Sequence, residues 1–420
     1  MNKFQKKLVP ELRFDEFSGD WTNTNVLNLV KDGILLKPQD GNHGEIHPKS
    51  SDYVDKGIPF VMSNNIHNGN LDLLSCKHIP KTVADNLQKG FSREGDVLLT
   101  HKGTVGEVAL VNKIEYPYLM LTPQVTYYRI IDSEQLYNIF LARYFVSPNF
   151  QKRLKVEADS GTRPYIGIIQ QGKLPVVFPK IKEQQKIANF LTAVDQRISL
   201  LKQKTAALET YKKGLMQKIF SQEIRFKDEN GDDYPDWVEK RLGEVYDLQG
   251  GGTPSTSNKS YWNGDIDWFT PTEMKSKYCN QSKRKITQSG LQKSSAKLLP
   301  IGSLLFTSRA TIGDMSIALK ECSTNQGFQS FLPSNKNDLE FLYYWILNNR
   351  KIFIRMSSGS TFLEISKKEI EKIKIDLAVL REQKKIADCL SSMDQSINKL
   401  KNQIEQTTQF KKGLLQKMFV

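Results

Sequence analysis

The sequence has few of the residues that usually build metal or redox sites. Its 420 residues include only four cysteines, Cys76, Cys279, Cys322 and Cys389, and no two of them form a CxxC pair. This scatter is typical of reduced thiols in a cytosolic protein and argues against a disulfide framework or a zinc site. All five histidines lie in the first half of the chain, the last of them at His101. We therefore expect them at the surface or in local contacts with a base, and not around a metal.

Long apolar runs are also missing. No stretch approaches the roughly 20 apolar residues that a membrane-spanning helix needs, and the basic start, residues 1–17, is not followed by the apolar segment of a signal peptide. We therefore expect a soluble, cytoplasmic protein with no membrane partner. Positive charge, in contrast, is abundant, because 60 Lys and Arg against 46 Asp and Glu leave a net charge of +14. Such an excess favours an acidic partner, with DNA or RNA first.

No catalytic motif stands out. No glycine-rich cofactor loop follows a strand, and there is no Asn-Pro-Pro-aromatic or Asp-Pro-Pro-aromatic stretch of the kind expected in an adenine-N6 methyltransferase. Residues 167–173 have the spacing of a phosphate-binding loop, but Leu174 stands where a magnesium-binding hydroxyl is required. Asp376 with Glu382 suggests a nuclease carboxylate cluster, yet the first half of the chain has no acid matching Asp376. We interpret Glu382 as part of a capped, solvated helix start, and we expect no catalytic activity in this chain.

The chain is organised around a long segment that occurs twice. Residues 183–220 and 382–419 align without a gap at a constant offset of 199, and neither copy contains proline. Apolar residues recur at alternating steps of four and three, with Thr205 in one slot of the first copy, which is the pattern of a coiled-coil seam. The seam residues are Ile187, Leu191, Val194, Ile198, Leu201 and Leu208 in the first copy, and Ile386, Leu390, Met393, Ile397, Leu400 and Ile404 in the second.

Each copy predicts a helix about 57 Å long, at about 1.5 Å per residue. Two core helices of one large domain would be the simplest alternative, but long patterns without caps favour two helices that pair with each other. A looser repeat surrounds them, because Glu-Leu-Arg-Phe at 11–14 returns as Glu-Ile-Arg-Phe at 223–226. The arrangement is cyclic, so we expect pseudo-two-fold symmetry. The predicted parts are a globular region at 1–179, a helix at 180–222, a second globular region at 223–378, and a helix at 379–420.

The two globular regions share a pattern of predicted elements. Strands are expected at 96–100, 107–111 and 174–178 with a helix at 133–156 in the first region, and at 303–307, 314–319 and 373–377 with a helix at 338–356 in the second. Turns at 100–106 and 307–313 join the first two strands of each set. Strands mixed with one or two helices indicate an α+β fold. Residues 31–57 have little counterpart in residues 250–259, as expected if two domains of one fold read different targets.

Polar and basic side chains gather in loops near the predicted strand ends. Such groups can reach base edges and phosphates, so the set as a whole favours DNA contact, although an ordinary polar loop residue remains the alternative for each one alone. The candidates are Ser63, Asn64, Lys102, Thr104, Gln124 and Arg163 in the first region, and Thr272, Lys275, Arg309, Thr311, Asn325 and Gln326 in the second. The five tryptophans are expected in cores or interfaces. No residue set predicts a metal site.

Together these features resemble the specificity subunit of type I restriction–modification enzymes. The resemblance rests on two variable α+β regions, each followed by a near-identical helix that starts EQxKIA and ends KKGLxQKxF, and on the paired segments GDVLLTHKGTVG (95–106) and GSLLFTSRATIG (302–313). It covers essentially the whole chain. It implies that the globular regions are target recognition domains, each reading one half of a split DNA site with an unspecified spacer. The two helices would pair antiparallel and act as a ruler between the domains.

The resemblance also implies partners and cofactors that this chain does not itself supply. Two copies of a separate methyltransferase subunit would use S-adenosylmethionine to methylate adenine N6 in double-stranded DNA, and two motor-nuclease (restriction) subunits that use ATP and magnesium are further partners it allows. The chain itself would bind no cofactor. A coiled-coil scaffold of another complex, with no role in DNA binding, is the alternative, and an enzyme acting alone on nucleic acid is a third hypothesis. The sequence does not specify the bases read or the spacer length.

Overall fold

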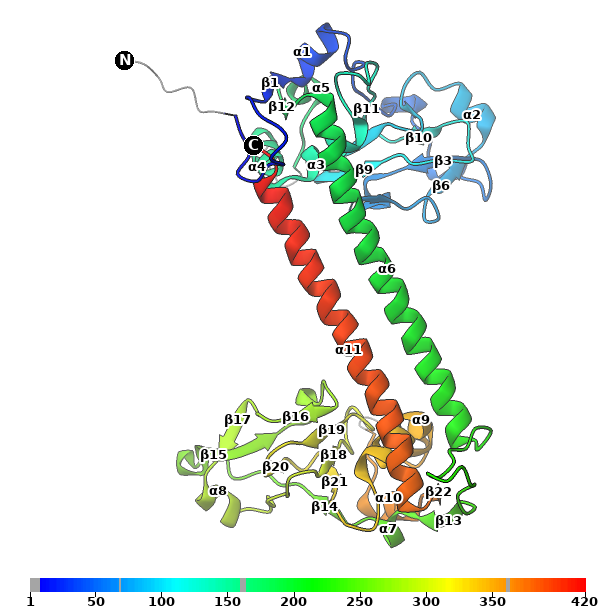
Figure 1. Ribbon diagram of the computed structural model, residues 1–420, viewed down its shortest axis with the longest axis vertical. Helices are drawn as coiled ribbons and strands as arrows, with labels where there is room; N and C mark the ends of the chain where they lie inside the picture. Colours follow the sequence, from blue (N-terminus) through cyan, green and yellow to red (C-terminus); the bar gives the residue numbers. More distant parts are fainter. Residues whose placement is uncertain (1–7, 68, 159–163, 360–362) are drawn as a thin grey trace. The chain divides into compact units, whose positions relative to one another are not determined.

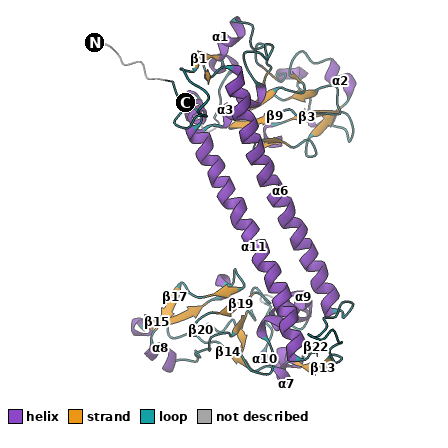
Figure 2. Cartoon of the chain, in the orientation of Figure 1, coloured by secondary structure: helices purple, strands orange, loops and turns teal. Residues whose placement is uncertain are grey.

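The computed structural model describes residues 8–67, 69–158, 164–359 and 363–420. The chain divides into two units: unit 1 comprises residues 1–202 and 402–420, and unit 2 comprises residues 203–401. Two long helices, α6 (Ile181–Phe220) and α11 (Leu380–Lys417), contribute to both units (Figure 1). Each unit otherwise mixes strands with short helices (Figure 2), so the predicted α+β fold is confirmed. None of the described helices is long and apolar enough to cross a membrane.

The described strands of unit 1 form two sheets of four strands and two strand pairs. One sheet has the order β6–β3–β10–β7, with β3 and β10 parallel, and the other has the antiparallel order β2–β11–β8–β9. The pairs are β1 with β12 and β4 with β5. The elements are β1 (Thr22–Asn25), α1 (Val26–Lys31), β2 (Gln39–Asp40), η1 (Gly44–Ile46), η2 (Ser50–Asp52), β3 (Ile58–Val61), η3 (Ser63–Asn65), β4 (Ile66–His67), β5 (Asn70–Leu71), β6 (Lys77–Ile79), α2 (Lys81–Asp85), β7 (Phe91–Ser92), β8 (Val97–Lys102), β9 (Thr104–Leu110), β10 (Leu119–Leu121), β11 (Val125–Tyr128), α3 (Asn138–Val146), α4 (Pro148–Glu157), α5 (Ile168–Gln171) and β12 (Pro175–Phe178).

Unit 2 has a related plan with a different division of strands between its sheets. Its five-stranded sheet has the order β14–β21–β18–β19–β16, and its three-stranded sheet, β17–β15–β20, again contains one parallel pair, β15 with β20. The strands β13 and β22 pair as β1 and β12 do in unit 1. The elements are β13 (Val238–Arg241), α7 (Leu242–Val245), β14 (Leu248–Gly250), η4 (Lys259–Tyr261), β15 (Trp262–Phe269), η5 (Pro271–Glu273), β16 (Tyr278–Cys279), β17 (Arg284–Ile286), α8 (Gln288–Gln292), β18 (Leu304–Phe306), β19 (Met315–Ala318), β20 (Cys322–Thr324), β21 (Gln329–Phe331), α9 (Leu339–Arg355), α10 (Lys367–Lys372) and β22 (Lys374–Leu377).

Two short strands correct one prediction about the variable regions. The strand β2 pairs with β11 just as β14 pairs with β21, so the segment after residue 31 does have a structural counterpart. Both strands are followed by a glycine that the backbone crowds. A Cβ on Gly41 would lie 1.9 Å from the Leu121 carbonyl oxygen, and a Cβ on Gly251 would lie 2.0 Å from that of Asn325. Strands this short have no readable periodicity, which is why the sequence pattern did not reveal them.

The predicted helix at 133–156 is two helices, α3 and α4. Ser147 has an extended backbone, with ψ of 143°, and its hydroxyl accepts a hydrogen bond from the backbone N–H of Phe150 at the start of α4. Pro148 occupies the first turn of α4, and a proline disfavours helical geometry at the residue before it. The helix predicted at 338–356 is present as α9. The turn predicted at 100–106 is shorter than expected, because β8 and β9 continue until Lys102 pairs with Thr104.

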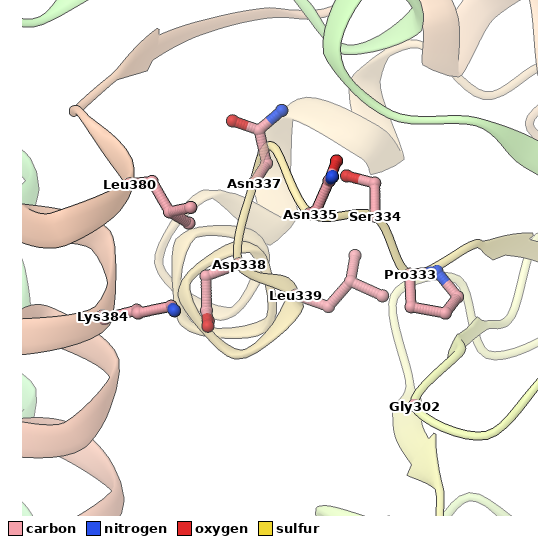
Figure 3. Close-up of a pocket in the computed structure, with 9 residues that line it drawn as sticks. All are labelled: Gly302, Pro333, Ser334, Asn335, Asn337, Asp338, Leu339, Leu380 and Lys384. Atoms are coloured by element: carbon pink, nitrogen blue, oxygen red, sulfur yellow. The ribbon is translucent and has the colours of Figure 1, made fainter.

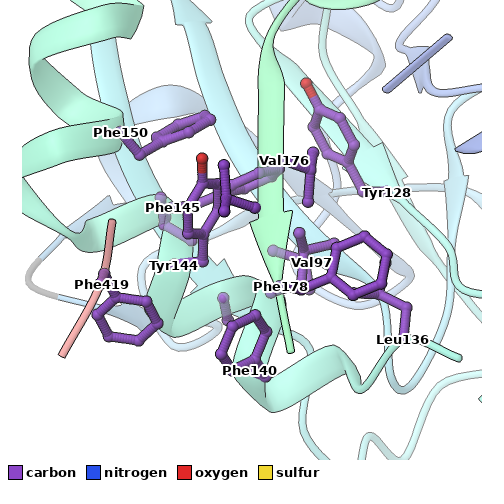
Figure 4. Packing of buried hydrophobic residues seen from close by; sticks show 14 of the residues in the cluster. Val97, Tyr128, Leu136, Phe140, Tyr144, Phe145, Phe150, Val176, Phe178 and Phe419 are labelled. Atoms are coloured by element: carbon purple, nitrogen blue, oxygen red, sulfur yellow. The ribbon is translucent and has the colours of Figure 1, made fainter. Parts of the chain in front are cut away.

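The start of each long helix packs into the core of its own unit. In unit 1, Ile187 and Leu191 of α6 are buried in a cluster with Phe140 of α3 and with Phe419, just beyond the end of α11. Figure 4 shows Phe419 among the aromatic side chains of this cluster. In unit 2, Leu390 of α11 is buried in the equivalent cluster. Full burial of a large apolar side chain stabilises a fold by about 1.5–3 kcal/mol, so these contacts anchor both ends of the helix pair.

The long helices α6 and α11 lie in antiparallel contact. Within unit 2, Lys212 forms an ion pair with Asp394 and Glu209 forms one with Lys401, so residue numbers rise along one helix as they fall along the other. In unit 1, Lys411 of α11 bonds Asp195 of α6 at 2.6 Å. The seam residues Ile187, Leu191, Val194, Ile386, Leu390, Ile397 and Leu400 are buried, and Ile198, Leu201, Leu208, Met393 and Ile404 are half-buried.

Candidate nucleic-acid interface

The first candidate surface forms where two parallel strands of unit 1 end side by side. Because β3 and β10 are parallel, the residues after their C-terminal ends meet at one edge of the sheet. Ser63 follows β3 and Gln124 follows β10. The Ser63 hydroxyl donates a hydrogen bond to Oε1 of Gln124 at 3.1 Å, and the Ser63 backbone N–H donates to the same oxygen at 3.4 Å. Two candidates that are 61 residues apart in sequence are thus in direct contact.

The β8–β9 hairpin completes this surface. The backbone N–H of His101 donates to the Gln124 carbonyl at 2.9 Å, which fixes the hairpin beside the β10 loop. At its tip, Lys102 and Thr104 are exposed on either side of Gly103. We define edge 1 as residues 62–65, 101–106 and 122–124. It contains every described candidate of unit 1, including the exposed Asn64, while Arg163 lies outside the described residues.

Unit 2 builds the same surface from its own parallel pair. The strands β15 and β20 end together at Phe269 and Thr324, and the Asn325 backbone N–H donates to the Phe269 carbonyl at 3.1 Å. The Ser308 N–H donates to the Gly327 carbonyl at 2.8 Å, which places the β18–β19 turn beside them. We define edge 2 as residues 270–273, 308–313 and 325–327. It contains the candidates Thr272, Arg309, Thr311, Asn325 and Gln326, and the exposed Lys275 lies two residues beyond it.

Matching backbone hydrogen bonds make the two turns equivalent. The Thr100 hydroxyl accepts from the Glu107 N–H at 2.9 Å, and the Thr307 hydroxyl accepts from the Asp314 N–H at 3.1 Å. Three residues after each threonine the backbone φ is positive, +81° at Gly103 and +61° at Ala310. Both turns end at a glycine with positive φ, Gly106 and Gly313. Such conformations are rare for residues other than glycine, so the shared turn shape is specified locally.

The short 3-10 turns at the two edges are also equivalent, and the sequence did not reveal this. The Met62 N–H donates to the side-chain oxygen of Asn65 at 2.8 Å, and the Thr270 N–H donates to the carboxylate of Glu273 at 2.8 Å. Each turn is therefore closed by its fourth residue, one with an amide and the other with a carboxylate. An Asn or Glu four residues after a strand end is a possible signal, but it is weak without knowledge of the strand ends.

A buried polar cluster lies beneath edge 1. Asp40 is 2% exposed and bonds Lys89 and His43, the latter at 2.7 Å, while Nε2 of His101 lies 3.8 Å from its carboxylate. Burial acts to raise the pKa of Asp40, but the hydrogen bonds from Lys89 and His43 keep it below its ordinary value. Burial lowers the pKa of His101. His101 is fully buried, so the expectation of a surface or base-contacting histidine is wrong for it. Nδ1 of its ring lies 3.1 Å from the Ile166 carbonyl oxygen, and the ring packs against that of Tyr165.

The cations of the two edges are in different states. Lys102 is exposed at the hairpin tip, and no described side chain pairs with its ammonium group. Arg309, its counterpart in edge 2, bonds Glu364 through Nε at 2.7 Å, with both side chains about half exposed. Exposed pairs of this kind contribute about 0–1 kcal/mol, so a phosphate can compete for Arg309 at little cost.

Glu382 is not the solvated helix-start residue expected from the sequence. It is fully buried and accepts two hydrogen bonds from Arg225, both at 2.9 Å, and one from the indole N–H of Trp237 at 2.9 Å. In unit 1, Arg13 donates to both oxygens of Glu183 at 2.8 and 2.7 Å. Arg13 and Arg225 therefore connect the segment that precedes the first strand of each globular region to the start of the long helix that follows that region. Glu183 and Glu382 therefore have a structural role.

A separate pocket lies at the start of α9 in unit 2. Figure 3 shows its lining, which includes Ser334, Asn337, Asp338 and Lys384. None of the candidate DNA-contacting residues lines it. Across the part of the chain that the structure describes, no three His, Cys, Asp or Glu side chains are grouped so that they could hold a metal ion. The two edges are therefore the surfaces to which the candidate residues point.

Comparisons with known proteins identify the family of this chain. A family model described as the type I restriction modification DNA specificity domain matches the chain twice, at residues 40–210 and 234–407. The type I restriction enzyme MjaIX specificity subunit of Methanocaldococcus jannaschii is 35% identical over 192 residues, an alignment that covers 44% of this chain and 44% of that relative. The MjaVIII specificity subunit of the same organism is 25% identical over 390 residues, covering 86% of this chain and 88% of the relative.

Solved structures share the fold. The S subunit of a type I restriction–modification system from M. genitalium matches with a TM-score of 0.58 at 17% identity, over 98% of this chain and 99% of that one. A chain from a structure on the assembly and conformational transition of the type I R-M system matches with a TM-score of 0.61 at 18% identity, over 95% and 97% of the two chains.

Proposed function

Since this chain belongs to the family of type I restriction–modification specificity subunits, the non-catalytic subunits that recognise DNA in these systems, we propose that it reads a split DNA site with edge 1 on one half-site and edge 2 on the other. The observation that carries this proposal is the construction of the two edges. One backbone scaffold occurs twice, and at matching positions it presents different side chains, such as Lys102 and Arg309. Equal scaffolds with unequal side chains suit two unequal half-sites.

The proposal assigns a role to each part of the chain. Residues 1–179 and 223–378 are the two target recognition domains, and the helices at 180–222 and 379–420 set the distance between the half-sites. The seam residues hold these helices together, with Leu191 and Leu390 at their anchored ends. Burial of both leucines supports this role. Lysines on the helices and edges add affinity through phosphate contacts, which carry no sequence information.

We further propose that the chain delivers partner enzymes to this site. The duplicated helix gives two similar docking positions, which suits two copies of a methyltransferase subunit that uses S-adenosylmethionine to modify adenine N6. Two ATP- and magnesium-dependent restriction subunits complete the assembly where they are present. One of the structures that this chain resembles was determined in work on the assembly of a type I R-M system. Because the substrate is cellular DNA, the complex would work in the cytoplasm.

A map of N6-methyladenine tests the proposal. Cells that express this chain with its neighbouring methyltransferase are compared with cells that lack only this chain, and we expect a split motif that depends on the chain. Replacing residues 1–179 with those of a relative should change one half of the motif and leave the other half intact. A change in both halves would contradict the assignment of one half-site to each edge. Absence of any chain-dependent methylation would favour a scaffold that does not bind DNA.

A further inference from the structure

The amide side chain of Gln124 has a fixed orientation at edge 1. Its Oε1 accepts hydrogen bonds from both the hydroxyl and the backbone N–H of Ser63. A backbone N–H can only donate, so the atom that it contacts must be the amide oxygen and not the nitrogen. A carbonyl oxygen has two lone pairs, and Ser63 occupies both. The carbonyl end of Gln124 is therefore engaged by Ser63, more closely by the hydroxyl at 3.1 Å than by the backbone N–H at 3.4 Å.

The Nε2 end of the Gln124 amide makes no hydrogen bond to a described residue. The side chain is half-buried at the edge, and no described residue accepts a hydrogen bond from its Nε2. Its two N–H groups are therefore available for a ligand. Edge 1 thus presents a donor at this position and no acceptor.

This polarity restricts which base Gln124 can read. A glutamine that recognises adenine donates to N7 and accepts from the N6 amino group, so it needs both ends of its amide. Gln124 has only its donor end free. Guanine and thymine carry a keto oxygen in the major groove, O6 or O4, that accepts from such a donor, whereas cytosine presents only an amino donor there. At adenine the amide can still donate to N7, but its other N–H group then faces the N6 amino group, so a keto base is preferred over adenine.

We propose that Gln124 reads a keto base, guanine or thymine, at one position of the first half-site, and that Ser63 is the positioning residue that selects against adenine there. The inference rests on the proposed function, because it names the base class that edge 1 selects. Ser63 and Gln124 act as one unit, because the contacts from Ser63 hold the Gln124 amide in this orientation. At edge 2, the Asn325 side-chain oxygen accepts one hydrogen bond from the described residues, that of the Gly327 N–H at 2.9 Å, so no such restriction follows there.

Gln124→Glu tests the inference by reversing the hydrogen-bonding polarity with little change in shape. The carboxylate still accepts from Ser63, but it offers a ligand only acceptors, which suit the amino group of cytosine or adenine. On the strand that Gln124 contacts, one position of the methylation motif should change from a keto base to an amino base. We expect discrimination on the order of 5- to 100-fold, as one specific base contact provides. Gln88→Glu is the matched charge control, because Gln88 is exposed and contacts Asn42 near edge 1 without belonging to the edge.

Two further variants keep the test decisive. Ser63→Ala removes one donor and releases a lone pair of Gln124, which can then accept from the adenine N6 amino group, so the preference for a keto base over adenine should be lost at the same position. Gln124→Ala should make this position degenerate and leave the rest of the motif unchanged, and it serves as the readout if Gln124→Glu abolishes methylation. A wild-type motif that persists in both Gln124 variants would overturn the inference while leaving the proposed function intact. A wild-type chain that gives no split motif would instead contradict the proposed function.

Discussion

The two edges differ less in backbone than in what surrounds it. In edge 1, Thr100 is followed by the buried His101, which lies next to Asp40. The next residue, Lys102, is exposed, and no described side chain pairs with its ammonium group. In edge 2 the matching residues are a buried Ser308 and an Arg309 that bonds Glu364. The hydroxyls of Thr100 and Thr307 hold each turn in place, whichever side chains follow them at the turn tip. Recognition can therefore diverge between the units without loss of the scaffold.

The same contrast appears where each long helix begins. Glu183 and Glu382 are aligned, buried and paired with an arginine, but only Glu382 also accepts from an indole, that of Trp237. The corresponding indole nitrogen of Trp21 is buried and has no hydrogen-bond partner among the described residues. The unit 2 fastening therefore holds three hydrogen bonds where the unit 1 fastening holds two from its arginine side chain.

Replacing these glutamates should give the largest effect. Glu382→Ala leaves Arg225 without its carboxylate and strands the Trp237 N–H, and removing one partner of a buried pair costs about 3–5 kcal/mol. Glu183→Ala strands Arg13 alone and should cost less. The free energy of unfolding from urea denaturation of the full chain measures both. Equal losses in the two variants would show that the indole contact adds nothing to the difference between the units.

The tryptophans give a smaller and cleaner version of the same comparison. Trp237→Phe removes a hydrogen bond to a charged acceptor, which contributes about 1.5–3 kcal/mol. Trp21→Phe removes an N–H that already lacks a partner, so only the loss of ring volume should destabilise unit 1. We expect the Trp237 variant to unfold at a clearly lower urea concentration than the Trp21 variant. The reverse order would contradict the assigned partners.

The sequence predicted what is periodic or repeated. The seam spacing located α6 and α11, and the paired segments located the two turns, because such signals extend over many residues. It did not predict the contact of Ser63 with Gln124, which depends on the parallel pairing of β3 and β10. Nor did it predict the burial of His101, because the sequence pattern of a polar residue at a strand end is the same whether or not neighbouring loops bury its side chain. Tertiary pairing decides both, and no local pattern records it.

Acidification should give the smallest effect, a difference between the two units in how much stability each loses. Burial holds the pKa of His101 below its ordinary value of about 6.5, against the opposing influence of Asp40 and the Ile166 carbonyl and with that of His43 and Lys102. Above pH 6.5 the residue is neutral in both states. As the pH falls below 6.5, the unfolded chain binds a proton there more readily than the folded chain does, so stability is lost.

The pKa of Asp40 is lowered below its ordinary carboxyl range, so its contribution is lost only at more acidic pH and does not interfere between pH 7.5 and 5.5. Hydrogen exchange, corrected for its intrinsic pH dependence, should therefore show β8 and β9 losing protection over this interval while β18 and β19, next to Ser308, do not. Burial also lowers the pKa of His47 in unit 1, so His101→Asn should reduce the dependence of β8 and β9 and leave the share that His47 contributes. If the two hairpins lost protection equally, or the variant kept the slope, the difference between the edges would not originate in the buried histidine.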